Sequence, residues 1–395
     1  GPVFRSTLLR AGAGHHVLLL TLHHILSDGW SIGVLCRELE ALYAAFTGGH
    51  APVLPALPVQ LADVSAWQRA QLAGERLAQE LDYWREQLRG CPPLALPTDH
   101  PRPPVFRWKG KTLPIAVDPP LAAALQRLAQ DHGATLFMVL MAAFQVLLAR
   151  YSRQDDFCVG WPIANRTREE MEPLIGFFAN TLVLRARLGE EPTFSELLGR
   201  VQKACLEAYA HQDLPFERLV EDLGASRDLG RNSIFQVLFV LQNAPYGALR
   251  LPGLEVSAIA TTNETAKFDL AMSLEPQPDG GLAGVIEYAS DLFEAPTIER
   301  LRGHYTSLLT AIAGDPQQRI AALPLLTAAE RHQRVTGGQA TATACPDRCI
   351  HERFEAHAAR DPAAVAVVYE DLRVTYGELD AQAGRLAHHL RALGV

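Results

Sequence analysis

The stretch LAAALQRLAQDHGATLFMVLMAAFQVLLARYS, residues 121–152, decides the fold class. Its first part repeats apolar residues with a helical period as far as Gly133, a residue type that commonly follows a helix. Its second part, from Thr135, is apolar around its whole circumference, which is typical of a helix in the interior of a domain. The longest uninterrupted apolar run, residues 136–144, is far shorter than the ~18 residues of a membrane span. We therefore predict two helices, the second of them buried.

Short apolar or β-branched runs flank these two helices, and such runs are typical of strands. Strands and helices alternate irregularly along the chain, which favours an α/β fold with layers around a mixed sheet. The predicted strands cover residues 16–22, 112–117, 157–163, 180–188, 234–242, 254–261, 268–276 and 282–288.

Two changes in composition indicate the domain organisation. The proline-rich stretch 91–108 excludes a helix and predicts an extended connection between two lobes. A second stretch, from about residue 325, is poor in large apolar side chains and ends at the amphipathic start at Ile350. The last segment is too short to form a core alone, so we expect it to begin a larger domain. The expected parts are an N-terminal lobe remainder with its linker (1–105), a C-terminal lobe (106–324), an inter-domain linker (325–349) and the start of a further domain (350–395).

The charge and cysteine content exclude several classes of protein. The formal net charge is −8 and the isoelectric point is near 6.0, with no basic block of the kind that neutralises phosphates. Six scattered cysteines favour reduced thiols in a cytosolic protein over a disulfide framework. Cys345 and Cys349 lack a second ligand pair, so no metal site is predicted. We expect no nucleic-acid partner, no membrane association and a cytoplasmic location.

The stretch LLLTLHHILSDGWSIGVLCRELEALYAAF, residues 18–46, reads as a strand, a polar turn and an amphipathic helix. Period-two geometry would send His23 and His24 to opposite faces of the strand. Asp28 could cap the helix, orient a histidine ring or pair with an arginine. Gly29 could allow a close backbone approach, with its N–H facing a substrate oxygen. A buried structural histidine pair beside a helix cap remains the simpler interpretation of an isolated His-His dipeptide. The helical face is expected to carry Leu35, Leu39, Leu42 and Phe46.

The full pattern HHILSDG, residues 23–29, resembles the HHxxxDG active-site motif of condensation domains of non-ribosomal peptide synthetases. Four further segments resemble motifs of that family in the same order, and Gln60, Ser65, Gly230 and Ser233 depart from its commoner residues. They are VQLADVSAWQRAQL (59–72), IGFFANTLVLR (175–185), HQDLPFE (211–217) and RDLGRNSIFQVLF (227–239). The resemblance implies a two-lobed, chloramphenicol-acetyltransferase-like fold of mixed sheets with flanking helices.

The same resemblance implies peptide-bond formation between two thioesters carried on the 4'-phosphopantetheine groups of carrier domains, with no cofactor bound by this segment itself. His24 matches the active-site histidine, which takes a proton from the tetrahedral intermediate or positions the amine. Asp28 is either a second base or a structural residue paired to an arginine, for which Arg227 and Arg231 are candidates. We favour the structural role, because a carboxylate is a poor acceptor for ammonium protons. The remaining candidates, expected to line the cleft or bridge the lobes, are His23, Trp30, Asn180, His211, Gln212 and Asp213.

The C-terminal segment resembles the beginning of an adenylation domain of the same synthetases, with VTYGEL, residues 374–379, in place of the family's LTYxEL. The implied partners are upstream and downstream carrier domains and the adjoining adenylation domain. Condensation domains also have an N-terminal segment ahead of the part that this chain resembles. We therefore expect the chain to be a fragment that is inactive by itself.

Two alternatives to a condensing enzyme stay open at this point, an epimerisation-type relative and a non-catalytic module. Epimerisation domains carry a pattern like DGVSWRIL, where this chain has Trp30-Ser31-Ile32-Gly33 after the Asp-Gly pair. Heterocyclisation domains carry an aspartate-based motif, which is absent here. A non-catalytic docking or gating module would bind carrier domains without reacting their substrates. The donor class, whether an L-residue, a D-residue or a fatty acyl group, cannot be read from these residues.

Overall fold

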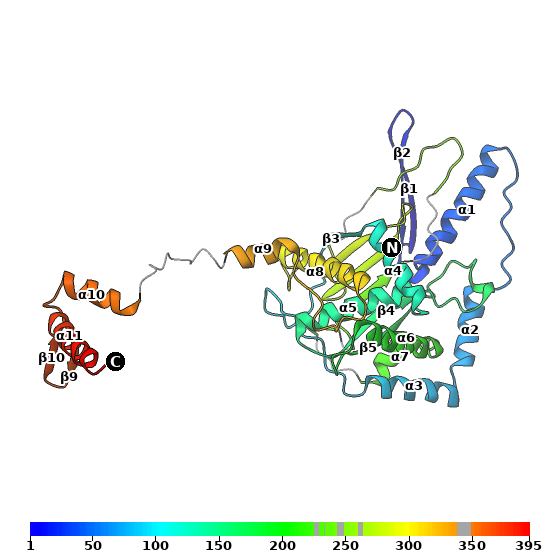
Figure 1. Cartoon of the computed structure of the whole chain (residues 1–395). Coiled ribbons are helices and arrows are strands. Elements are labelled where there is room, and N and C mark those ends of the chain that lie inside the picture. Colours follow the sequence, from blue (N-terminus) through cyan, green and yellow to red (C-terminus); the bar gives the residue numbers. More distant parts are fainter. Residues whose placement is uncertain (225–228, 233, 243–248, 260–263, 338–348) are drawn as a thin grey trace. The chain divides into compact units, whose positions relative to one another are not determined.

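The computed structural model of the chain forms two units, Gly1–Ala329 and Glu330–Val395, which are described separately (Figure 1). The residues it describes are 1–224, 229–232, 234–242, 249–259, 264–337 and 349–395.

The two helices predicted from residues 121–152 are present as α4 (Pro119–Asp131) and α5 (Leu136–Ser152). Gly133, just after α4, has a φ of 61°, a conformation that glycine adopts without strain. The Thr135 side chain caps α5 by accepting a hydrogen bond from the Met138 N–H at 3.3 Å. Every residue from 138 to 148 is buried, so the prediction of a core helix is confirmed.

A six-stranded mixed sheet forms the centre of the first unit. Phe144 of α5 packs on Phe239 of the sheet with ring centroids 5.4 Å apart, and α5 also contacts α4, α6 (Phe194–Ala210) and α8 (Ala295–Gly314). Neighbouring strands are antiparallel except for the pairs β7–β6 and β6–β4, which are parallel. The predicted α/β layering is therefore confirmed. In spatial order the strands are β3 (Gly110–Val117), β8 (Leu282–Ala289), β7 (Leu270–Pro276), β6 (Val237–Leu241), β4 (Asp156–Ile163) and β5 (Asn180–Arg187).

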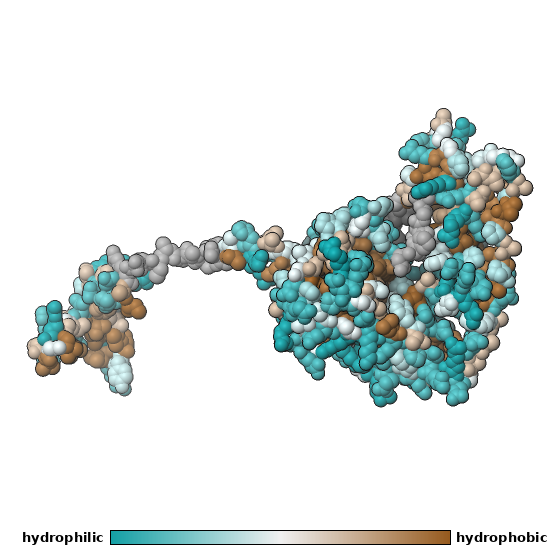
Figure 2. Space-filling model, turned by 45° about the vertical axis from the view of Figure 1, so that its right-hand side comes forward, coloured by the Kyte–Doolittle hydropathy of each residue, from teal (hydrophilic) through white to brown (hydrophobic). Residues whose placement is uncertain are grey.

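In the first unit the strand predictions were wrong at two places, and the two strands of the second unit were not predicted. Residues 254–259 form no strand, and the remainder of that prediction, 260–261, lies outside the described residues. The strand β1 (Phe4–Gly12) was not predicted, because its apolar residues are exposed and only its pairing with β2 (His15–Leu22) defines it. Together β1 and β2 form a separate antiparallel hairpin that protrudes from the unit and carries exposed leucines (Figure 2).

The proline-rich stretch 91–108 contains no helix, as predicted. Hydrogen bonds attach it to residues next to strands of the six-stranded sheet. Leu94 is buried, and its N–H donates to Gln236 Oε1 at 2.7 Å. Arg102 Nη1 donates to Asp269 Oδ1 at 2.8 Å. The other elements of this unit are the short 3-10 helices η1 (His24–Leu26) and η2 (Glu169–Met171) and the helices α1 (Gly29–Thr47), α2 (Leu61–Gln71), α3 (Gly74–Leu88) and α7 (Phe216–Asp222).

The stretch predicted as an inter-domain linker contains the helix α9 (Ala328–Gly337), and its residues 338–348 lie outside the described part of the chain. The C-terminal unit contains a two-stranded sheet between two helices that contact each other. Its elements are α10 (Ile350–Arg360), β9 (Val365–Tyr369), β10 (Leu372–Thr375) and α11 (Tyr376–Ala392).

Among the described residues, no individual helix combines the length and apolar character needed to cross a membrane. By length and composition alone, the bent pair of α4 and α5 meets that test together.

Candidate active site

The histidine pair lies in a turn rather than on a strand. β2 ends at Leu22, and His24 begins the 3-10 helix η1. The His23 N–H donates to the Val3 carbonyl at 2.8 Å, and its Nδ1 accepts the Ile25 N–H at 3.1 Å, which caps η1. The prediction that strand alternation separates the two rings was therefore wrong, because β2 ends at Leu22 and His24 belongs to the 3-10 helix η1.

The His24 ring is held at the surface by two contacts. Nδ1 lies 2.7 Å from the Ser27 carbonyl oxygen, and the ring meets Phe177 edge to face with centroids 5.1 Å apart. A carbonyl oxygen can only accept, so Nδ1 carries the hydrogen. In the neutral ring Nε2 then holds the lone pair, and His24 is exposed to solvent. This tautomer can accept a proton from a bound group through Nε2.

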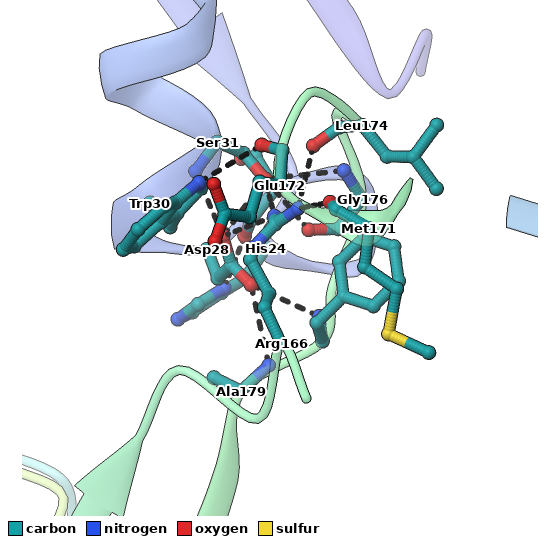
Figure 3. A network of polar contacts seen from close by, with 12 residues as sticks. His24, Asp28, Trp30, Ser31, Arg166, Met171, Glu172, Leu174, Gly176 and Ala179 are labelled. Atoms are coloured by element: carbon teal, nitrogen blue, oxygen red, sulfur yellow. Dashed lines mark hydrogen bonds and ion pairs between the residues drawn. The ribbon is translucent and has the colours of Figure 1, made fainter. Parts of the chain in front are cut away.

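Asp28 is buried beneath this turn, and both of its oxygens accept hydrogen bonds. Oδ1 accepts from the N–H and the hydroxyl of Ser31, at 2.9 and 2.8 Å, which caps α1. Oδ2 accepts from the backbone N–H groups of Phe178 and Ala179, at 3.0 and 3.2 Å. The carboxylate thus connects the start of α1 to the segment that precedes β5 (Figure 3).

Arg166 is the cationic partner of Asp28. Its Nη2 lies 3.2 Å from Asp28 Oδ1 and donates to Ser31 Oγ at 2.9 Å, and both charged side chains are almost fully buried. Its Nη1 donates to the carbonyls of Met171 and Leu174, and its guanidinium lies 4.2 Å from the centre of the Phe178 ring (Figure 3). Hydrogen bonds to both charges are what make a buried ion pair tolerable.

The Asp28 carboxyl is held in its charged form. Burial is the largest single influence and raises its pKa, but the hydrogen bonds from Ser31 and Phe178 and the charge of Arg166 together keep the pKa below its usual value. Burial lowers the pKa of Arg166, and Asp28 opposes that change. Asp28 has no oxygen free for a substrate proton.

The lowered pKa of Asp28 predicts a loss of stability in acid. A carboxyl whose pKa is lower in the folded chain stabilises the fold above its unfolded pKa of about 3.9, and this contribution disappears as the pH falls through the folded pKa. We expect the free energy of unfolding, measured in urea, to fall between about pH 5 and pH 3. The slope should be smaller in Asp28→Asn. Equal slopes in the two proteins would contradict the pairing.

Trp30 and Gly29 lie at the start of α1, directly after Asp28. Gly29 is the first residue of the helix. Trp30 Nε1 donates to the Glu172 carbonyl at 2.9 Å, which gives α1 a second contact with the segment held by Arg166 (Figure 3). Of the apolar residues expected along one face of α1, Phe46 is largely exposed, whereas Leu35, Leu39 and Leu42 are half-buried.

Asn180 is buried and fixes the HQDLPFE segment to the beginning of β5. Its Nδ2 donates to the carbonyls of Gln212 and Leu214, at 2.9 and 2.8 Å, and its Oδ1 accepts the Phe216 N–H at 3.0 Å. All of these partners are backbone groups. The Asn180 amide therefore positions the segment by its backbone.

Two residues of the HQD sequence, His211 and Asp213, contact α3. His211 Nδ1 lies 3.0 Å from Glu80, and its ring stacks on Tyr83 at 3.7 Å. Asp213 forms a 2.6 Å ion pair with Arg76. These contacts connect α3 to the region after α6. They are separate from the contacts of Asp28 with Arg166 and Phe178.

The choice of arginine partner for Asp28 was wrong. Asp28 forms its ion pair with Arg166. Arg231, which was proposed for this role, is half-buried in the segment 227–239. Arg227 lies outside the described residues. The nearby Arg168 packs over Trp67 instead, 4.6 Å from that ring. Nothing in the local sequence IANRTREE distinguishes Arg166 from Arg168. In the structure the chain turns after β4 at Asn165, which has a φ of 51°. Sequence reasoning therefore missed Arg166.

No group of three or more histidine, cysteine or acidic side chains suited to a metal ion is found in the described part of the chain, and Cys345 falls outside that part.

Comparison with known proteins adds three findings. The sequence model of the Condensation domain family matches residues 1–334. A linear gramicidin synthase polypeptide of Brevibacillus parabrevis is 46% identical over all of this chain, and chondramide synthase cmdD of Chondromyces crocatus is 45% identical over all of it. The chain spans 5% and 10% of the lengths of those two relatives.

Solved structures of other proteins are similar to this chain in fold. The X-domain from teicoplanin biosynthesis is 32% identical, with a TM-score of 0.75 over 82% of this chain and 75% of that one. A four-domain non-ribosomal peptide synthetase, bound to AMP and glycine, aligns with a TM-score of 0.77 over 100% of this chain and 31% of that one, at 23% identity. The second likeness, at that identity, concerns the fold alone.

Proposed function

The chain belongs to the condensation-domain family of non-ribosomal peptide synthetases, and on that basis we propose that it joins two carrier-bound substrates by a peptide bond. The amine of a carrier-bound aminoacyl acceptor attacks the thioester carbon of a carrier-bound acyl or peptidyl donor. The nitrogen–carbon bond forms, the carbon–sulfur bond breaks, and the donor carrier leaves as a free thiol. The observation that carries this proposal is the exposed His24 ring, whose Nδ1 is bonded to the Ser27 carbonyl, so that Nε2 carries the lone pair of the neutral ring.

His24 needs only modest basicity for this reaction. An α-amine has an unperturbed pKa of about 7.7 to 8.0, so freeing it at pH 7 costs only ~1 kcal/mol. The more useful step is removal of the proton from the attacking nitrogen once the tetrahedral intermediate has formed, or positioning of the amine before attack. Nε2 of His24 suits both roles, because the Ser27 hydrogen bond fixes the ring and its tautomer.

Asp28 serves in this proposal as the structural support of the catalytic turn. Its buried, fully hydrogen-bonded carboxylate and its contact with Arg166 fix the start of α1 and hence the turn that carries His24. Trp30 contributes to the same support through Glu172. Gly29 is proposed to let the substrate approach the backbone at the helix start, and His23 to stabilise the turn as its cap.

The HQDLPFE segment is proposed to bridge the two lobes. Asn180 fixes its backbone to β5, and His211 and Asp213 reach α3, which precedes the proline-rich connection. Gln212 takes part through its carbonyl group. A bridge of this kind would set the separation of the two lobes, between which the two carrier-bound substrates would meet.

Residues 350–395 are proposed to be the start of an adenylation domain. The VTYGEL sequence supports this assignment, and the alignment with the linear gramicidin synthase polypeptide continues through these residues although the condensation-domain match ends at 334. The partners would then be an upstream and a downstream carrier domain, each bearing phosphopantetheine, and the adjoining adenylation domain.

A recruiting module without condensation activity is the second candidate. It is favoured by the likeness to the teicoplanin X-domain, which has also been solved in a complex with OxyB and is 32% identical to this chain in that structure. The intact histidine motif favours the catalytic function instead.

A single-turnover assay on the full-length polypeptide separates these two functions. The donor carrier is loaded with an acyl or peptidyl thioester and the acceptor carrier with an aminoacyl thioester, and both carriers are followed by mass spectrometry of the intact domains. Transfer of the donor mass to the acceptor carrier is the expected result. Carrier binding without transfer, for donors of all three classes, would identify a recruiting module.

A further inference from the structure

Two cysteines from distant parts of the chain lie in direct contact in the first unit. Cys91 follows α3 at the start of the proline-rich stretch, and Cys158 is on β4, 67 positions later. Their sulfur atoms are 3.0 Å apart. A disulfide has a sulfur–sulfur bond of about 2.05 Å, so closing this pair requires a movement of only about 1 Å.

The surrounding contacts hold the two thiols together. Arg185, the neighbour of Cys158 across β4 and β5, donates to the carbonyls of Gln87 and Arg89, at 3.1 and 2.9 Å. The same guanidinium forms a doubly hydrogen-bonded ion pair with Asp156, at 2.6 Å for each bond. The strand end and the chain that leads to Cys91 are therefore fixed to one another independently of the cysteines.

The chain that follows Cys91 is also attached to the residues just before β4. Gln154 Nε2 donates to the Pro93 carbonyl at 3.1 Å, and its Oε1 accepts the Ala95 N–H at 2.7 Å. The two sides of Cys91 are thus both held, and a thiol fixed beside its partner reacts as if the partner were highly concentrated.

We propose that Cys91 and Cys158 form a reversible oxidation site, at which a peroxide converts the two thiols to a disulfide that ties the proline-rich connection to β4. Cys91 is half-buried and within reach of a small oxidant, whereas Cys158 is buried behind it. The other described cysteines, Cys36, Cys205 and Cys349, lie on α1, on α6 and at the start of α10, so the pair is distinguished by its geometry.

The two cysteines differ in a way that assigns their order of reaction. The hydrogen bond from the Cys158 thiol lowers the pKa of Cys91, with Arg185 acting in the same direction against the effect of burial. Donation of that hydrogen bond and burial both raise the pKa of Cys158. Because the thiolate is the nucleophile, Cys91 reacts first.

The reaction balances with one peroxide molecule. The Cys91 thiolate attacks one peroxide oxygen and breaks the oxygen–oxygen bond, and with one proton this gives a sulfenic acid and water. The Cys158 sulfur then displaces hydroxide from the Cys91 sulfur, and the hydroxide leaves as water with the Cys158 proton. Two thiols lose two electrons in total, and the peroxide is reduced to two molecules of water.

Peptide mapping after mild oxidation tests the proposal. The reduced full chain is treated with a small excess of hydrogen peroxide, its remaining thiols are blocked, and it is digested with trypsin without reduction. We expect a cross-linked pair of peptides, 90–107 and 154–166, with the summed mass less two hydrogens, which separates on reduction. The oxidised protein should unfold about 5 °C higher than the reduced one, because the bond closes a long loop.

The variant Cys91→Ser should lose the cross-link and the thermal shift, and Cys36→Ser, a half-buried thiol of the same unit, is the matched control that should keep both. A different cross-link, or stable sulfinic acid at Cys91 with the Cys158 thiol intact, would overturn the proposal. So would formation of the bond only in denaturant. The mapping of the unsubstituted protein decides the matter even if Cys91→Ser fails to fold.

Discussion

His24→Ala is expected to lower the single-turnover rate of condensation about 10²-fold, and by at least tenfold, while both carrier domains still bind. The reason is the loss of Nε2, the ring nitrogen that can accept a proton from the reacting amine, and general-base catalysis typically contributes a factor of this size. Quenched-flow analysis of the transferred acyl group measures the rate, and a binding assay with each loaded carrier measures the affinity.

Two further variants make this test specific for Nε2. In His24→Asn the side-chain amide can still donate to the Ser27 carbonyl, so the turn keeps its hydrogen bond while the basic nitrogen is removed. Its rate should fall as far as that of His24→Ala. His16→Ala removes an exposed histidine of another His-His dipeptide, on β2, and should leave the rate unchanged. A rate near that of the unsubstituted protein in His24→Asn would mean that His24 acts only through the turn.

Asp28→Asn is expected to destabilise the first unit by about 3–5 kcal/mol, the usual cost of removing one member of a buried ion pair. The amide cannot replace the carboxylate in either orientation. Its NH₂ group would face either the N–H groups of Phe178 and Ala179, or Ser31 N–H and Arg166, and each of these is a donor. Arg166 would also lose its compensating charge. Urea unfolding followed by circular dichroism measures the change.

Asp213→Asn provides the matched control for this substitution. Asp213 pairs with Arg76 at 2.6 Å, but both side chains are more than a third exposed, so the loss should be only about 0–1 kcal/mol. An Asp28→Asn protein with unchanged stability and a large loss of condensation rate would contradict the structural role and would identify Asp28 as a group that acts directly on the substrates.

The sequence by itself determined the elements whose signal is local. The helical period and all-round apolar character of α4 and α5, and the apolar runs of the sheet, follow from which residues a short segment must bury. The motif HHILSDG pointed to His24 and Asp28 through its resemblance to the condensation-domain motif, which is a pattern of seven consecutive residues. The prolines of residues 91–108 likewise excluded a helix through their own geometry.

Only the tertiary structure decided which distant residues meet. Arg166 stands 138 positions from Asp28, and nothing in its own segment distinguishes it from Arg168. Cys91 and Cys158 are brought together in the same way, although their spacing carries no pattern. The strand β1 was missed because pairing with β2, and not burial, defines it. A periodic pattern indicates which side chains of a segment are buried and which face solvent. Which distant residues become partners depends on the path of the whole chain, and no local pattern encodes that path.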